Sequence, residues 1–63
     1  MNTTRHSFFQ TDADYNGTLL AAMADFNARY PGKTAISAAY LCASPGDENG
    51  NRYIEVEITF VKE

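Results

Sequence analysis

Arg-Tyr-Ile-Glu-Val-Glu-Ile-Thr-Phe-Val, residues 52–61, is the stretch that decides the fold of this chain. Apolar and polar residues alternate along it, and the apolar ones are β-branched or aromatic, which is the pattern of a strand with one buried face. The apolar face consists of Ile54, Val56, Ile58 and Phe60. That face needs a cover, whereas the opposite face carries two glutamates and can stay in water. We therefore predict a one-sided sheet covered by a helix.

The helix is predicted upstream of this strand. Aromatic and large apolar residues follow helical spacing and form one stripe, which we expect to face the core: Tyr15, Leu19, Met23, Phe26 and Tyr30. Thr11 to Asp14 is typical of a helix start, but Asn16-Gly17 is typical of a turn. The helix therefore begins near Asp12 with a weak point at Gly17, or only at Thr18. Tyr30-Pro31-Gly32 ends it, because proline disfavours helical geometry in the residue before it.

Two more segments are predicted to be extended. Residues 34–43 carry no charge and form a hairpin with residues 52–61, closed by the loop Ser44–Asn51. Thr4 to Gln10 is either a strand or an arm that docks on a neighbouring subunit, and only one of Phe8 and Phe9 can join a one-sided core. The fold class is thus α+β in one domain, residues 1–63. We predict an antiparallel sheet of the two hairpin strands and a possible N-terminal third strand, with one helix packed on one face, in the order βαββ.

The pairing of the hairpin follows if its loop closes symmetrically. Ala43 then lies opposite Arg52 and Ala35 opposite Phe60, so that small residues face large ones. Leu41, Ala39 and Ser37 would pair with Ile54, Val56 and Ile58. The other face would pair Tyr40 with Glu55 and collect the following residues: Ile36, Tyr40, Tyr53, Glu55, Glu57 and Val61. Its mixture of tyrosine, apolar and acidic side chains is typical of a protein interface.

Size and charge narrow the class of function. A chain of 63 residues buries only about 60% of the surface that its unfolded form exposes, so its stability is marginal and we expect a homodimer or higher oligomer. With a single cysteine no internal disulfide can form, and this favours a reducing compartment. No apolar run is long enough for a membrane span. We therefore expect a cytoplasmic protein. Eight acidic residues against five Lys and Arg argue against direct nucleic-acid binding and favour a partner with a basic surface.

Three groups of residues resemble chemical sites. Asp12-Ala13-Asp14-Tyr15-Asn16-Gly17 resembles the first half of an EF-hand calcium loop, but Met23 stands where that loop needs a bidentate glutamate. We therefore favour helix capping and a turn over calcium there. His6 and Cys42 are the only histidine and cysteine and cannot make a four-ligand zinc site. Glu55 and Glu57 share a strand face as acid–base pairs do, although solvated strand charges are commoner.

The chain as a whole resembles the dodecin family of small flavin-storing oligomers. The resemblance rests on its length, on the strand–helix–strand–strand order and on the ending Tyr53-Ile54-Glu55-Val56-Glu57-Ile58-Thr59-Phe60. It implies a flavin stacked on a tryptophan of the second strand. Ala35 and Ile36 occupy the corresponding region of this chain, which contains no tryptophan.

We expect a non-enzymatic protein–protein interaction module without cofactor or metal. One version is a small acidic inhibitor, from a phage or mobile element, that binds a nucleic-acid-handling host protein by presenting carboxylates where phosphates would lie. The expected partner-binding residues are Ile36, Tyr40, Asp47, Glu48, Tyr53, Glu55, Glu57 and Val61; Asp12 and Asp14 would add charge. The alternative is a dodecin-like flavin carrier assembled as a homo-oligomer.

Overall fold

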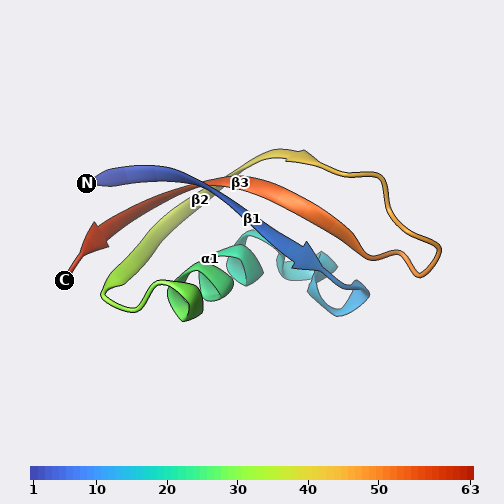
Figure 1. Ribbon diagram of the computed structural model, residues 1–63, viewed down its shortest axis with the longest axis horizontal. Helices are drawn as coiled ribbons and strands as arrows, with labels where there is room; N and C mark the ends of the chain where they lie inside the picture. The colour runs from blue at the N-terminus through green and yellow to red at the C-terminus, as the bar shows by residue number, and fades with distance from the viewer.

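Three strands and one main helix make up the computed structural model of the chain, which describes all of residues 1–63 except the side chains of Asp12 and Ala13. The elements are β1 (Asn2–Gln10), the short 3-10 helix η1 (Asp12–Gly17), α1 (Thr18–Arg29), β2 (Lys33–Ala43) and β3 (Arg52–Lys62). β3 lies between β1 and β2 and is antiparallel to both. Figure 1 shows the helix covering one face of the sheet. The α+β class and the βαββ order are therefore confirmed, and the N-terminal segment is a strand.

The core lies between α1 and the apolar face of β3. Ile54, Val56 and Ile58 are each 0% exposed, as the alternation in residues 52–61 predicts. β1 adds Phe8, which is buried, while its neighbour Phe9 is 46% exposed on the other side of the sheet. We call the helix-covered side of the sheet the inner face and its opposite the open face.

The helix is turned relative to the predicted stripe. Phe26 is buried as predicted and Met23 packs against the core, but Tyr15, Leu19 and Tyr30 are 41%, 39% and 44% exposed. Ala22, which the stripe did not include, is fully buried. The methyl side chain of Ala22 allows the helix backbone to lie close to the sheet, and the Phe26 ring packs 5.3 Å from the ring of Phe60. The prediction was wrong for Tyr15, Leu19 and Tyr30 because it considered only large side chains, whereas a helix packed on a sheet can place a small residue at the point of closest approach.

The start of the helix combines both predicted alternatives. A short 3-10 helix of six residues, η1, occupies residues 12–17, and the α-helix proper begins at Thr18. The Asp14 carboxylate accepts long hydrogen bonds from the amide and hydroxyl of Thr11, at 3.4 and 3.3 Å, as expected of an acidic residue in the first turn. The side chain of Asp12, which the calcium and charge predictions also used, lies outside the described part of the chain.

Two β-bulges in β2 change the predicted pairing of the hairpin. Ala35 lies opposite Phe60 as predicted, but the register then shifts between Ala35 and Ser37 and again between Tyr40 and Cys42. Each bulge inserts one residue without a partner and moves the following side chains to the other face. The pairs on the inner face are Lys33–Lys62, Ala35–Phe60, Ala38–Ile58, Tyr40–Val56 and Ala43–Ile54. Those on the open face are Thr34–Val61, Ser37–Thr59, Ala39–Glu57 and Cys42–Glu55. The predicted register assumed a loop that closes symmetrically and strands without bulges. The two bulges also make β2 the less regular of the two edge strands.

Two buried polar side chains fasten the helix to β1. Gln10 is 0% exposed; its amide nitrogen donates to the hydroxyl of Thr18 at 2.6 Å and its amide oxygen accepts from Arg52 Nε at 2.8 Å. His6 is 5% exposed, and its Nε2 lies 2.6 Å from Asp25 Oδ2, which also accepts from Arg29 Nε at 2.9 Å. Since these groups satisfy one another, they can be buried at little cost.

Candidate functional site

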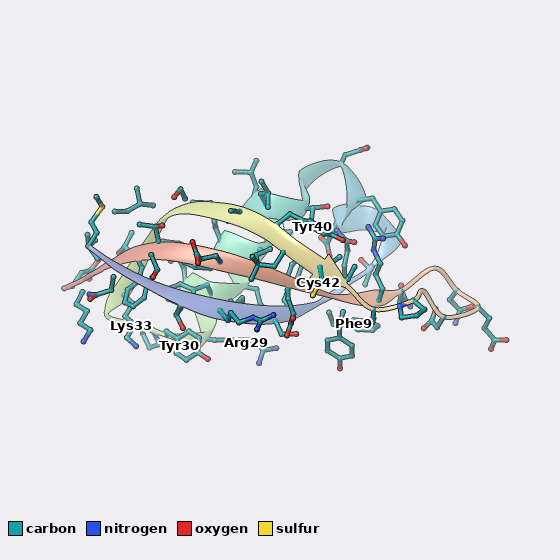
Figure 2. The ribbon with its side chains drawn as sticks, turned by 90° about the horizontal axis from the view of Figure 1, so that it is seen from above. Phe9, Arg29, Tyr30, Lys33, Tyr40 and Cys42 are labelled. Carbon is teal, nitrogen blue, oxygen red and sulfur yellow. The ribbon has the colours of Figure 1, made fainter. Side chains whose placement is uncertain are left out.

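The open face of the sheet is a continuous surface that no other element of the described structure covers. Strand pairing places residues of all three strands on it, and Figure 2 looks down on this side of the sheet, with the helix behind. We define it by these residues: Thr3, Arg5, Ser7 and Phe9 from β1, Tyr53, Glu55, Glu57, Thr59 and Val61 from β3, and Ser37, Ala39 and Cys42 from β2. Small β2 side chains therefore flank a central row of large and acidic ones.

The middle of the open face holds a hydrogen-bonded trio. Arg5 donates to Glu55 Oε2 at 2.9 Å, and the Cys42 thiol donates to the same oxygen at 3.0 Å. The thiol hydrogen bond and the Arg5 charge hold the pKa of Glu55 below its ordinary value. The same hydrogen bond raises the pKa of the Cys42 thiol. Glu55 is therefore a carboxylate at neutral pH and Cys42 a thiol, which makes Cys42 a poor nucleophile.

Glu57 is the uncompensated charge of this face. It is exposed, lies directly opposite Arg5 on one side and Ala39 on the other, and makes no ion pair among the described side chains. Arg5 donates to Glu55 instead. Two carboxylates and one guanidinium thus leave a net negative charge at the centre of the open face.

An aromatic pair borders the charged centre towards the hairpin loop. Phe9 and Tyr53 lie directly opposite each other, with ring centroids 5.4 Å apart in an edge-to-face arrangement. They are 46% and 58% exposed. At the other end of β3, Val61 is 38% exposed. Aromatic side chains that are held in place and exposed are typical anchors of protein interfaces.

The loop between β2 and β3 extends this surface beyond the helix (Figure 1). Asp47 Oδ1 accepts hydrogen bonds from the amides of Asn49 and Asn51, at 2.8 and 2.9 Å, so this carboxylate shapes the loop. Glu48 is exposed at the tip. Tyr15 anchors the loop to η1, because its hydroxyl donates to the Gly50 carbonyl and its ring lies 5.0 Å from the Arg52 guanidinium.

The predicted partner-binding residues divide into three groups. Tyr53, Glu55, Glu57 and Val61 share the open face, and Asp47 and Glu48 lie in the loop next to it. Tyr40 does not belong with them: the register places it opposite Val56 on the inner side, at the sheet edge, where it remains 55% exposed. Ile36 is the unpaired residue of the first bulge. The face assigned to Tyr40 was wrong because of that bulge.

Arg5 and Phe9 are the open-face residues that sequence reasoning missed. The signal was present, since adjacent phenylalanines in a strand must point to opposite faces and one of them had to lie outside the core. The partner of β1 could not be deduced, because β1 pairs with the last strand across most of the chain.

The remaining candidates lie apart from one another. His6 is buried on the inner face and Cys42 is exposed on the open face, so the sheet separates them. Among the described side chains no three metal-ligating residues come together. At the position where the dodecin resemblance implies a flavin-stacking ring, Ala35 is buried and Ile36 carries no ring.

No family of proteins, no curated protein and no solved structure matches this chain. Within the described residues, no helix has the length and apolar character needed to cross a membrane. The assignment of function therefore depends on the geometry of the open face.

Proposed function

We propose that the chain is a non-enzymatic binding module whose open face and hairpin loop dock onto a protein with a basic surface. The observation that carries the proposal is the uncovered centre of the sheet, where Glu57 stands unpaired beside the exposed Phe9–Tyr53 pair. Alternating residues of one strand thus form the core and the binding surface.

Charge complementarity favours this kind of partner. The chain carries a net charge of −3. Glu48 at the loop tip and Glu57 on the sheet are exposed and make no ion pair among the described side chains. Acidic groups along one surface attract a basic partner over a distance of about one Debye length, roughly 8 Å at physiological salt.

The aromatic pair would supply most of the affinity. Tyr53 can bury its ring against a partner and keep its hydroxyl hydrogen-bonded, and Phe9 holds that ring at a fixed angle. Interfaces concentrate their binding energy in a few such residues, while charges at the rim mainly set the association rate.

A protein that handles nucleic acid is the class of partner we infer. The basic surface of such a protein binds regularly spaced phosphates, and carboxylates on a rigid strand can bind there in place of the phosphates. Glu55 and Glu57 lie two residues apart on the same face of β3, a rigid arrangement of this kind. In this proposal the chain is an inhibitor from a phage or mobile element that acts by occupying the nucleic-acid site.

The test is capture from a cell extract at low and high salt with charge-altered variants. Glu57→Lys should abolish capture of one basic protein, and high salt should weaken capture by the unaltered chain. Ala24→Lys with Ala28→Lys makes the same change in net charge on exposed helix positions and should leave capture intact. Capture that withstands both salt and Glu57→Lys would contradict the proposal. A yellow purified protein would favour the flavin carrier instead.

A second copy of the chain is the occupant we propose for the free edge of β2. No charged residue lies between Thr34 and Ala43, whereas native edge strands are usually protected by charge. Ile36, Tyr40 and Leu41 are 48%, 55% and 42% exposed along this strand. Light scattering should give at least twice the chain mass for the unaltered protein and the monomer mass for Tyr40→Lys; a monomer in both cases would rule out this contact.

A further inference from the structure

A cavity of about 140 Å³ opens on the inner side of the sheet, away from the open face. It lies where α1 ends, and its lining comes from all four main elements: Thr4, Arg5, Phe26, Tyr30, Lys33 and Phe60. Phe26 and Phe60 are 1% and 5% exposed and form its floor. Tyr30 and Lys33 are more exposed and form its rim, which Figure 2 shows at one end of the molecule.

The rim concentrates positive charge in an acidic protein. Lys33 lines the cavity, and Lys62 lies directly opposite Lys33 in the β2–β3 pairing. Arg5 also lines the cavity, but its guanidinium donates to Glu55 on the open face. Like charges directly opposite each other destabilise a sheet. Neither lysine makes an ion pair among the described side chains. The neighbouring Glu63 carboxylate accepts a hydrogen bond from Thr34 at 2.6 Å.

The ammonium group of Lys33 is held over two aromatic rings of the cavity. Its Nζ lies 5.4 Å from the ring centroids of both Tyr30 and Phe60, which are cation–π distances. A charge placed there is partly shielded from water by the rings. An anion next to it would therefore gain more than at an open surface, while any apolar part of the ligand could contact the ring edges.

We propose that this cavity binds a small organic anion with a carboxylate group and a flat apolar body. Lys33 would pair with the carboxylate, Lys62 would add positive charge, and Phe26 and Phe60 would contact the apolar body. Pockets for nucleotide-sized or drug-sized ligands are several times larger, typically about 300–1,000 Å³, so the ligand is about the size of a single ring. The site differs from the proposed protein-binding face, since Phe26, Phe60 and Lys33 lie on the inner side of the sheet, and Arg5 is the residue that the two sites share.

Benzoate is the probe for the test, with amide resonances of the ¹⁵N-labelled protein as the readout. Benzoate should shift the amides of Thr4, Lys33 and Phe60 in a saturable way. Benzamide, which has the same shape without the charge, and inorganic phosphate, which has charge without a ring, should each bind at least roughly tenfold more weakly. Equal binding of either control compound would overturn the proposed ligand class.

Two variants locate the site. Lys33→Met keeps the side-chain stem over the rings and removes the charge, and it should weaken benzoate binding about tenfold with the circular dichroism spectrum unchanged. Glu48→Gln, at the distant loop tip, should leave benzoate binding unchanged. Benzoate binding that withstands Lys33→Met, or shifts confined to residues outside the cavity, would overturn the proposal.

Discussion

The two faces of β3 are made by alternate residues of one strand, and their environments are opposite. Ile54, Val56 and Ile58 are 0% exposed against the helix, while Tyr53 is 58% exposed and Glu57 is also open to water. The inner residues are fixed by packing, and a change to any of them alters the fold. The open residues contact one another but are not part of the core, so their chemistry can vary at a smaller cost in stability. One strand thus separates what specifies the fold from what is available for binding.

The largest contrast is expected from truncating neighbouring residues on the two faces. Ile58→Ala should lower the free energy of unfolding by about 2–5 kcal/mol, because it leaves a cavity in the core of a small domain. Thr59→Ala, one residue further on the open face, should change it by less than about 0.5 kcal/mol. Urea unfolding followed by circular dichroism measures both. Similar losses for the two variants would show that the faces do not differ as described.

A buried polar residue should give the next largest effect. Gln10→Ala removes the amide that joins Thr18 to Arg52 and leaves both without that partner, at a cost of about 1–3 kcal/mol. Ser7→Ala, an exposed position of the same strand, is the control and should be nearly neutral. Thermal unfolding of the two variants checks this; equal melting temperatures would contradict the buried role of Gln10.

Truncation of the two acidic residues of the loop should also have unequal effects on stability, with a smaller difference than for Gln10 and Ser7. Asp47→Ala removes the acceptor for two loop amides and should cost about 1 kcal/mol. Glu48→Ala should leave stability unchanged and weaken binding of the basic partner, because Glu48 is exposed at the tip. Urea unfolding and binding measured on the same pair of variants separate a structural carboxylate from a functional one. A larger stability loss for Glu48→Ala would reverse this assignment.

The smallest effect concerns protonation on the open face. Glu55 raises the pKa of the Cys42 thiol, so Glu55→Gln should lower that pKa and speed alkylation by iodoacetamide near pH 8. Arg5 opposes this shift, and Arg5→Gln should slow alkylation. The rates measured across pH 7–10 give both directions, and unchanged rates in both variants would contradict the described trio.

The same trio sets the sign of a pH effect on stability. Because the pKa of Glu55 is lowered in the folded protein, its contribution is complete above the pKa it has in the unfolded chain. The contribution is lost as pH falls through the lower, folded value. Glu55→Gln should therefore reduce the loss of stability on acidification.

Much of the fold could be predicted because β3 is regular. Its strict alternation identified the core residues Ile54 to Phe60, and the Tyr30-Pro31-Gly32 sequence located the end of the helix one residue after Arg29. β2 could not be predicted equally well. Its many alanines fit either face of a sheet, so nothing in the sequence marked the bulges after Ala35 and Tyr40.

The site residues of β3 could be predicted from the sequence, whereas the residues contributed by β1 and β2 could not. Tyr53, Glu55 and Glu57 followed from alternation alone. Tyr40 was assigned to the wrong face by one bulge, and Arg5 was missed because its contact with Glu55 joins residues 50 positions apart. Pairing over that distance depends on the complete sheet, which local sequence patterns do not determine.

Site-specific photo-crosslinking shows whether the partner binds to the open face of β3. A benzophenone side chain is placed at Tyr53 on the open face or at Leu20, which is 73% exposed on the helix. The Tyr53 probe should cross-link to one basic protein in a cell extract and lose that product when Glu57→Lys is added, while the Leu20 probe should give no such product. Cross-linking from Leu20 alone, or a Tyr53 product that survives Glu57→Lys, would contradict the account.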